Sequence, residues 1–296
     1  DFLKGVMTMF NLVSMIDDDN PNNILIEPYA NIFVKNTNCA ATGGVSLACR
    51  NIEHDWTEKV DASEMDLKPL TNLNKDTIFK FVEDEDDYVA TVYNNSTGYL
   101  YGSKTYNNWQ MDILEGTDEI IADPFASTVS KALDSSLPQF VVPAIYAMND
   151  NGTTEGFENL PRIFYNNGMK DVGGAGETYF VPAQNNEPAE NIDIFLQFSH
   201  LSSIPTFAST TDFVFESGQL LVSGPSPVNN LYNLWWAPYF NQLYNSDTRI
   251  MTNLTPSDIA NFKFYDKVMI KNRSFGVNKI EYKPNELATV EFILLP

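Results

Sequence analysis

The sequence predicts a mainly β protein with a few helices, an α+β chain, and three features lead to this class. Short runs of β-branched and aromatic residues recur between Gly, Pro and Asn turns along most of the 296 residues. The C-terminal end holds three alternating runs with short connections, which predict an antiparallel meander. Strands and helices do not alternate over the lengths that a parallel α/β sheet requires.

The N-terminal residues predict a helix followed by a short strand. Phe2–Met15 carries an apolar stripe at helical spacing, and the turn sequence Asp17–Pro21 ends it. Asn23–Tyr29 then predicts a strand that ends at Pro28. Lys35–Glu53 is rich in Asn, Thr and Gly and predicts an exposed loop or hairpin outside the main fold.

The central part predicts short strands, one helical turn and two polar loops. Strands are expected at Thr77–Glu83, Tyr88–Tyr93, Phe140–Met148, Arg162–Tyr165, Tyr179–Val181, Ile192–Leu201 and Asp212–Phe215. The acidic run Glu83–Asp87 joins the first two strands and is expected to be a solvated turn. Thr128–Leu133 predicts a helical turn, whereas Asn149–Leu160 and Gly168–Glu190 predict surface loops.

Leu231–Tyr244 predicts an amphipathic helix whose apolar stripe is mostly aromatic. Its apolar residues come in adjacent pairs four residues apart, with Asn233 and Gln242 on the opposite face. Pro238 removes one helical hydrogen bond and is expected to bend the helix near Leu234. Large rings bury much area, so we expect aromatic anchors for the surrounding sheets. The anchors expected here and elsewhere in the core are Trp56, Trp235, Trp236, Tyr239 and Phe240.

The C-terminal part begins with an expected strand at Arg249–Thr252. A short helical turn follows, with Thr255 as its N-cap and Pro256 at its first position. The meander strands are Lys267–Lys271, Ser274–Tyr282 and Ala288–Leu295. The full predicted core is Phe10, Leu12, Ile24, Ile26, Trp56, Trp235, Tyr239, Phe240, Val268, Ile270, Val277 and Val290.

Composition limits the classes of function. The net charge is −21, from 18 basic and 39 acidic residues, which argues against a surface that grips nucleic acid or an anionic membrane. No apolar run reaches the ~18–20 residues of a membrane-spanning helix, so no such segment is expected. Cys39 and Cys49 flank a short Gly-containing stretch and are candidates for a disulfide, with the free thiols as the equal alternative.

No catalytic, cofactor or metal site emerges from the motifs. The two histidines, His54 and His200, lie near no nucleophile motif, and zinc would need clustered Cys and His. Acidic turns supply calcium-type ligands but are more often solvated. A glycan hydrolase needs only a carboxylate pair, which 39 acidic residues always offer, so this alternative stays open. A sugar-binding platform is conceivable from Trp56, Tyr99, Tyr101, Tyr106 and Trp109.

Several landmarks, taken in order, resemble the large tail structural proteins of tailed bacteriophages. They are Phe2–Leu12, Asn23–Tyr29, Asp55–Asp61, Asn230–Asn233 with the Trp235, Trp236 and Tyr239 rings, Asp247–Arg249, Pro256–Ile259, Phe262–Asp266, Val277–Ile280 and Thr289–Phe292. They bracket nearly the whole chain. Residues 35–53 depart from the pattern as an insertion, and the middle of the chain, from Asp134 to Glu190, matches poorly.

The resemblance implies hub- or tail-tube-like β-barrel or sandwich domains and a virion protein of the baseplate hub or tail tip. Such a protein is not an enzyme. It forms a ring of three or six copies, contacts other phage tail proteins, links tail tube to tip and lets the genome pass. It is assembled in the host cytoplasm and resides in the phage tail.

Three regions are expected: 1–133, with 35–53 as an insertion loop; 134–226, rich in loops; and 227–296, the aromatic helix with the meander. The alternative function is a receptor- or carbohydrate-binding adhesin module of the same particle, which the aromatic content and the Asn- and Gly-rich loops favour.

Overall fold

The computed structural model divides the chain into two compact units, each made from discontinuous segments. Unit 1 is Asp1–Met9, Thr77–Asn107 and Asp118–Asn233; unit 2 is Phe10–Asp76, Asn108–Thr117 and Leu234–Pro296. This division differs from the three consecutive regions expected, because strands distant in sequence pair within each unit. The structure describes every residue except 18–19, 35–51, 69–72, 110–111, 135–136, 146–159, 177, 182, 184–186, 203–210, 218–227, 245–246, 284–285 and 296.

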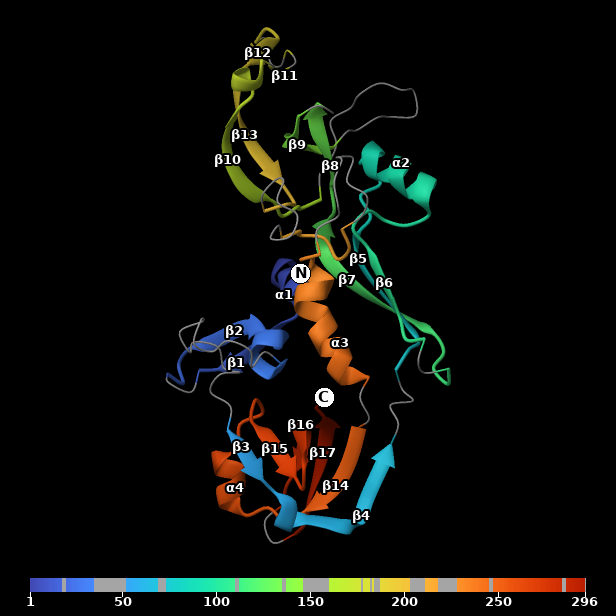
Figure 1. Ribbon diagram of the computed structural model, residues 1–296, viewed down its shortest axis with the longest axis vertical. Helices are drawn as coiled ribbons and strands as arrows, with labels where there is room; N and C mark the ends of the chain where they lie inside the picture. Colours follow the sequence, from blue (N-terminus) through green and yellow to red (C-terminus); the bar gives the residue numbers. More distant parts are fainter. Residues whose placement is uncertain are drawn as a thin grey trace. The chain divides into compact units, whose positions relative to one another are not determined.

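Both units are mainly β, as predicted, with few helices (Figure 1). Unit 2 is centred on a six-stranded sheet in the order β3-β15-β16-β17-β14-β4. Its strands are β3 (Glu53–Asp55), β4 (Val60–Lys68), β14 (Asp247–Thr252), β15 (Lys267–Ile270), β16 (Arg273–Glu281) and β17 (Ala288–Leu294). β15, β16 and β17 pair antiparallel, so the C-terminal meander is confirmed.

The order of the strands forces this sheet to curl. β3 and β4 are the two edges, yet only Trp56 and the 3₁₀ turn Thr57–Lys59 separate them in the chain. Edges of a flat six-stranded sheet would lie about 24 Å apart, whereas the five steps from Asp55 to Val60 span at most about 18 Å. The sheet therefore bends around its own inner face, which becomes the core.

Trp56 lies in that core, at the connection between the two edge strands. It is 2% exposed, and its ring centroid is 5.3 Å from Phe262 and 6.1 Å from Phe292. Alternate residues of the meander point to the same interior. The buried cluster is Trp56, Leu254, Phe262, Val268, Phe275, Val277, Ala288, Val290 and Phe292.

The helix α4 (Pro256–Asn261) begins as its sequence predicts. Thr255 Oγ1 accepts from Asp258 N at 3.3 Å, and Asp258 Oδ2 accepts from Thr255 N at 2.8 Å. This reciprocal pair satisfies two backbone donors that a helix start leaves open. Lys59 forms an ion pair with Asp258, which joins the helix to the turn before β4.

An N-terminal segment of unit 2 contacts the aromatic helix. β1 (Leu12–Ile16) and β2 (Ile24–Pro28) form an antiparallel hairpin, and a π-helix follows at Ala30–Val34. The Tyr29 hydroxyl donates to Gln242 Oε1 at 3.0 Å, and its ring meets Tyr239 edge-on at 4.9 Å. Burial, and then the neighbouring Tyr239, raise the pKa of Tyr29.

The predicted aromatic helix is present, with a change of pitch where Pro238 weakens it. Tyr232–Trp236 form a π-helix, and α3 (Ala237–Leu243) continues it. Wider i→i+5 turns accommodate the missing proline donor. Trp236 and Phe240 are buried, whereas Trp235 is only half-buried. Gln242, expected on the polar face, is 7% exposed because it accepts the Tyr29 hydroxyl.

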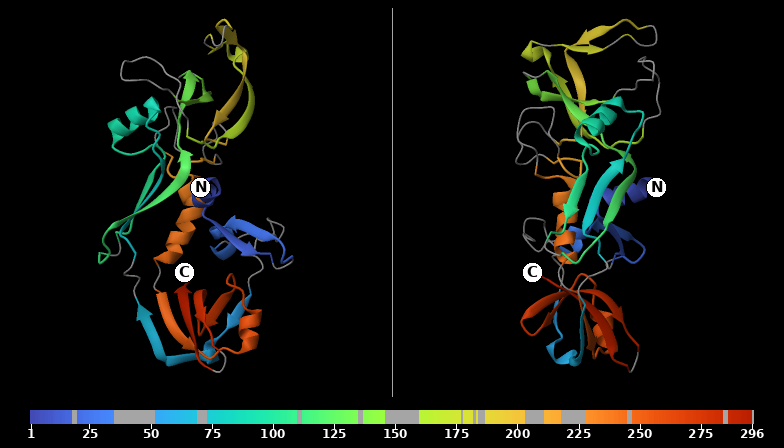
Figure 2. Two further views of the ribbon diagram at one scale, coloured as in Figure 1. Left: turned by 180° about the vertical axis from the view of Figure 1, so that it is seen from behind. Right: turned by 90° about the vertical axis from the view of Figure 1, so that its right-hand side faces the viewer.

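Unit 1 contains small sheets and two helices (Figure 2). The helices are α1 (Phe2–Phe10), whose last residue is assigned to unit 2, and α2 (Tyr88–Thr97). A three-stranded sheet has the order β6-β5-β7, from β5 (Asp76–Val82), β6 (Lys104–Asn107) and β7 (Thr117–Ala126). The other pairs are β8 (Val129–Asp134) with β9 (Leu137–Ala144), β10 (Tyr165–Asp171) with β13 (Ile194–Ser199), and β11 (Tyr179–Val181) with β12 (Glu190–Ile192).

Two expected strands, Arg162–Tyr165 and Asp212–Phe215, are not formed: β10 begins only at Tyr165, and Asp212 makes an isolated bridge with Leu201. Three further element predictions are wrong. The N-terminal helix ends at Phe10 rather than Met15, because Asn11 takes a positive φ of 48° and the next residues pair as β1. Tyr88–Tyr93 belongs to a helix, since Asp87 caps its start and Gly98 ends it with a φ of 82°. Thr128–Leu133 is mostly strand β8, stabilised by pairing with β9. In each case a cap or a partner outweighs local propensity.

The predicted core is partly correct. Trp56, Phe240, Val268, Val277 and Val290 are buried. Ile24 and Ile26 are 73% and 45% exposed, because they lie on the outer face of the β1–β2 hairpin. The other predicted members, Phe10, Leu12, Trp235, Tyr239 and Ile270, are half-buried.

Candidate functional site

A surface recess of about 1020 Å³ lies on the outer face of the β6-β5-β7 sheet in unit 1. Burial alternates strictly along β5, so Phe79 and Phe81 point inward while Ile78, Lys80 and Val82 face the recess. The right-hand view of Figure 2 shows this sheet. The recess is large enough for a ligand of several rings.

The walls of the recess come from both helices of the unit. Lys4 and Thr8 of α1 form one side, and the C-terminal end of α2 and the following loop form another. Gly5 allows α1 to lie against β7, since a Cβ there would be 2.3 Å from the main-chain oxygen of Asp123. A side chain at this position would therefore displace the α1 wall.

A second recess of about 560 Å³ adjoins the first. The two share Tyr99, Leu100, Ser103 and Thr105, and the smaller one extends to Glu216 and Ser217. Tyr99 is 66% exposed, so its ring stands at the boundary of both spaces. The aromatic ring and the hydroxyl groups around it make this surface a candidate ligand site.

The recess carries both signs of charge. Lys80 Nζ and Glu119 form an ion pair at 2.8 Å on its floor, and Glu83 accepts a 2.7 Å hydrogen bond from the Asn94 amide. Lys4 and Asp123 lie at its edge. Hydroxyl, amide, ammonium and carboxylate groups thus line one surface, with three carboxylates and two ammonium groups among them.

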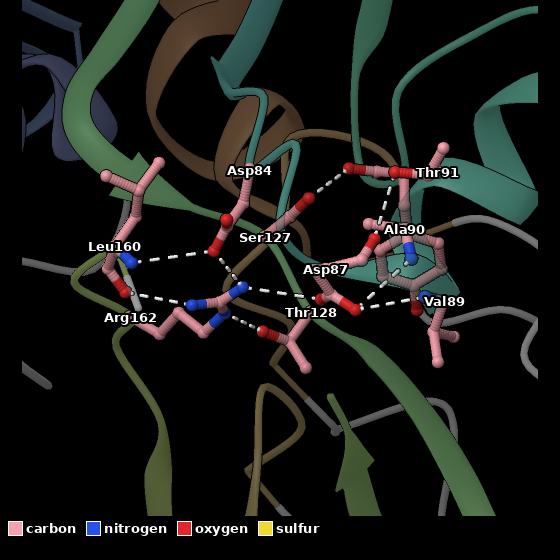
Figure 3. A network of polar contacts seen from close by, with 10 residues as sticks. Asp84, Asp87, Val89, Ala90, Thr91, Ser127, Thr128, Leu160 and Arg162 are labelled. Carbon is pink, nitrogen blue, oxygen red and sulfur yellow. Dashed lines mark hydrogen bonds and ion pairs between the residues drawn. The ribbon is translucent and has the colours of Figure 1, made fainter. Parts of the chain in front are cut away.

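A buried ion network holds the turn between β5 and α2 in unit 1 (Figure 3). Arg162 Nη2 donates to Asp84 at 2.6 Å and to Asp87 at 3.3 Å, and its Nε donates to Thr128 Oγ1 at 2.5 Å. Arg162 Nη1 donates to the Leu160 carbonyl at 2.9 Å. The three charged side chains are at most 5% exposed.

Asp87 also caps α2. Its Oδ1 accepts from Val89 N at 3.1 Å and from Ala90 N at 3.4 Å. The single guanidinium of Arg162 balances only one of the two carboxylates. The backbone donors and the positive end of the helix dipole stabilise the remaining negative charge. The expectation of a solvated turn at Glu83–Asp87 is therefore wrong for Asp84 and Asp87, which are buried because they bind Arg162.

A second buried network contains His200. Its Nδ1 lies 2.6 Å from Asp212 Oδ1, its Nε2 lies 3.0 Å from the Tyr101 hydroxyl, and the Ser217 hydroxyl donates to Asp212 at 2.6 Å. With the proton on Nδ1, the histidine donates to the carboxylate and accepts from the phenol. Burial, and then Asp212 and Tyr93, hold the pKa of Tyr101 well above its ordinary value, so the phenol stays a donor.

This second network has the parts of a catalytic triad without its geometry. A serine nucleophile would sit on the free histidine nitrogen, but Tyr101 occupies that nitrogen and Ser217 binds Asp212 instead. Tyr101, His200 and Asp212 are at most 2% exposed. The arrangement stabilises the loop that carries Asp212 against the rest of unit 1.

The other histidine has a comparable structural role in unit 2. His54 Nε2 lies 2.9 Å from Asp266 Oδ2, and Asp266 also accepts from Ile52 N at 2.8 Å and Lys263 N at 3.0 Å. These bonds join the start of β3 to the turn before β15. None of the three polar networks was predicted, since each depends on a contact between distant residues: Arg162 with Asp84, 78 residues apart, Tyr101 with His200, 99 apart, and Ile52 with Asp266, 214 apart. The two histidines were the one available signal.

The structure does not assemble the predicted aromatic platform. Trp56 and Tyr101 are buried in different units, and Tyr106 is half-buried. Trp109 is 74% exposed in unit 2, whereas Tyr99 belongs to unit 1. Of the five, Tyr99 alone lines the recess. Cys39 and Cys49 lie outside the described residues.

Within the described part of the chain, no group of three or more His, Cys, Asp or Glu side chains is placed to bind a metal ion. None of the helices described there has the length and apolarity needed to cross a membrane. A recess of about 190 Å³ in unit 2, lined by Tyr29 and Gln242 among others, is below the usual size of a ligand pocket.

Comparisons with known proteins add no relative to this picture. No family model matches the chain, and neither a curated protein nor a solved structure matches it.

Proposed function

We propose that the protein is a non-enzymatic structural component of a tailed-phage virion, forming a ring at the distal tail as part of a baseplate hub or tail tip. It links tail tube to tip and lets the genome pass. Its partners are further copies of itself, three or six in the ring, and other phage tail proteins. It assembles in the host cytoplasm and remains in the tail.

The observation that supports self-assembly is a row of exposed apolar side chains on the β10–β13 ribbon, the two-stranded sheet of β10 and β13. Along β13, Ile194, Leu196 and Phe198 are 52%, 42% and 39% exposed. The alternate residues Phe195, Gln197 and Ser199 are buried, so two of the three inward side chains of this strand are polar while its outward ones are apolar. Met169, 63% exposed, lies opposite Leu196 on β10 and extends the row.

The inward polar residues have a local reason, which leaves the outward apolar ones to be explained. Gln197 Oε1 accepts from Val141 N at 3.2 Å, and Ser199 Oγ lies 3.5 Å from Ser130 Oγ. The outward row has no comparable partner in the described residues. Exposed apolar rows of this kind mark surfaces that associate with another protein.

The charge and the sequence landmarks support the remaining parts of the proposal. A surface through which DNA slides should not bind phosphates, and a net charge of −21 has the sign that this requires. The ordered landmarks from Phe2–Leu12 to Thr289–Phe292 connect the chain to tail proteins by resemblance.

Mass measured by light scattering tests the proposal. The 33.3 kDa chain should form a closed assembly of three or six copies. The double variant Leu196→Glu, Phe198→Glu should be monomeric, because it places charge on the apolar row. Ile24→Glu is the matched control, since Ile24 is 73% exposed but belongs to the β1–β2 hairpin of unit 2.

A strict monomer of the unmodified chain at high concentration would overturn the ring. If the double variant still formed a ring, the protein would assemble as proposed, but the β10–β13 ribbon would not be part of the interface.

A second candidate function is a receptor- or carbohydrate-binding adhesin module of the same particle. The exposed Tyr99 ring, at the boundary of two adjoining recesses, favours it.

A further inference from the structure

The recess on the β6-β5-β7 sheet offers the chemistry that sugars require. Its floor alternates aliphatic side chains, Ile78, Val82 and Ile121, with the Lys80–Glu119 ion pair. Pyranose rings likewise present apolar C–H faces and hydroxyl groups on their edges. A surface that mixes small apolar patches with hydrogen-bonding groups therefore complements an oligosaccharide.

We infer that this recess binds a neutral oligosaccharide, with the ring of Tyr99 stacked against one sugar unit. The inference rests on the second of the two proposed functions and gives it a site. Tyr99 is the exposed aromatic side chain of the recess, and its ring borders both spaces, so one chain of sugars can occupy both. Rigid aromatic rings bury area at little loss of conformational entropy.

The polar groups of the recess suit hydroxyl groups, which both donate and accept. Ser103, Thr105 and Thr8 supply hydroxyl groups, and Asn94 supplies an amide. Carboxylates at Glu83, Glu119 and Asp123 accept hydrogen bonds, and Lys4 and Lys80 donate them. The surface thus has several ways to orient a sugar edge.

The charges make a polyanion the poorer ligand. Three carboxylates face two ammonium groups in the larger recess, whereas Glu216 in the smaller one is paired with Lys104 at 2.6 Å. A nucleic acid or a sulfated glycan would meet an excess of negative charge. A neutral sugar chain avoids that repulsion.

An array of neutral, N-acetylated and anionic oligosaccharides tests this inference, and titration calorimetry measures the affinity of the best neutral binder. Tyr99→Ala should weaken binding at least about tenfold. Thr105→Arg should abolish binding. Thr105 is exposed and lines both recesses, so the longer arginine side chain would fill the space that the sugar needs. Trp109→Ala is the matched control, an exposed aromatic outside the recess, and should change nothing.

Circular dichroism of each variant checks that the fold persists. Binding of a neutral oligosaccharide that Tyr99→Ala and Thr105→Arg weaken, with Trp109→Ala unaffected, supports the site. Binding that survives both substitutions keeps the carbohydrate-binding function but overturns this recess as its site. Selective binding of anionic glycans overturns the neutral ligand class. No binding anywhere on the array overturns the site and the carbohydrate-binding form of the second function, and leaves only its receptor-binding form.

Discussion

The curled sheet of unit 2 and the α2 side of unit 1 build their centres in opposite ways. The first buries Trp56 with aliphatic and aromatic residues around it. The second buries Arg162 between Asp84 and Asp87. Apolar contacts have little direction and tolerate related shapes, whereas buried charges are stable only with each hydrogen bond in place. The two regions should therefore respond differently to the same kind of substitution.

The largest effect is expected where a buried charge loses its partner. Arg162→Ala leaves Asp84 and Asp87 buried without a cation and should lower the free energy of unfolding by about 3–5 kcal/mol. Chemical denaturation followed by fluorescence measures it. Arg162→Lys should recover little, because an ammonium cannot reproduce the forked contacts to Asp84, Thr128 and Leu160.

Lys279→Ala is the control for this prediction. Lys279 and Glu281 form an ion pair with side chains 57% and 61% exposed, so its loss should change stability by at most about 0.5 kcal/mol. Equal effects of Arg162→Ala and Lys279→Ala would contradict the network's role in unit 1.

In unit 2 we expect a similar loss of stability when a buried ring is removed, but a larger recovery when a related residue replaces it. Trp56→Ala removes the ring at the β3–β4 connection and should lower the free energy of unfolding by about 3–5 kcal/mol. Trp56→Phe should recover more than half of that, because the site needs an apolar ring rather than a particular hydrogen bond. If Trp56→Phe recovered as little as Arg162→Lys, the contrast between the two regions would fail.

Removal of one hydroxyl group from the His200 network should cause an intermediate loss of stability. Tyr101→Phe leaves His200 Nε2 without its donor and should lower the free energy of unfolding by about 1–3 kcal/mol. Tyr99→Phe, at an exposed tyrosine, is the control and should have almost no effect.

The same tyrosine predicts a dependence on alkaline pH. The folded-state pKa of Tyr101 is raised above its ordinary value of 10.0, by burial first and then by Asp212. Its stabilising contribution is therefore complete below pH 10 and is lost as the pH rises through the folded-state pKa. Between pH 10 and 11.5, stability should fall less steeply in Tyr101→Phe than in the unmodified chain; identical slopes would contradict this.

The smallest effect is expected at the start of α4. Thr255→Ala removes one half of the reciprocal cap and should lower the free energy of unfolding by about 1 kcal/mol. Burial raises the pKa of Asp258, but hydrogen bonds from Lys59 and Thr255 outweigh it, so the net pKa is lowered. The contribution of Asp258 is then present above pH 3.8 and lost as pH falls further.

Thermal unfolding at pH 7 and at pH 3 measures both parts of this prediction. Ser257→Ala, in the same turn but outside the reciprocal cap, is the control. A difference between Thr255→Ala and the unmodified chain that is as large at pH 3 as at pH 7 would show that the charge of the Asp258 carboxylate contributes nothing to the cap.

The elements that the sequence predicted well have their causes close together in the chain. The meander follows from alternation within β15, β16 and β17 and from short connections between them. The start of α4 follows from Thr255, Pro256 and Asp258, all within one turn. The aromatic helix follows from its pairs of rings, although the π-helix before Pro238 sets its actual pitch.

The sequence predicted only one residue of the recess. Tyr99 was named among five aromatic residues, but local sequence does not distinguish an exposed ring from a buried one such as Tyr101 two residues later. The difference depends on His200, which receives the Tyr101 hydroxyl from 99 residues away. The tight approach of α1 to β7 at Gly5 likewise depends on a distant contact.

Composition and short-range periodicity account for the mainly β class, the C-terminal meander, the aromatic helix and the strongly acidic charge. Tertiary structure alone decided the curl of the six-stranded sheet, the two buried polar networks and the outward apolar row on β13. These depend on pairing between segments far apart in the chain. Such pairing selects which residues lose water and which remain exposed, and no local pattern records that choice.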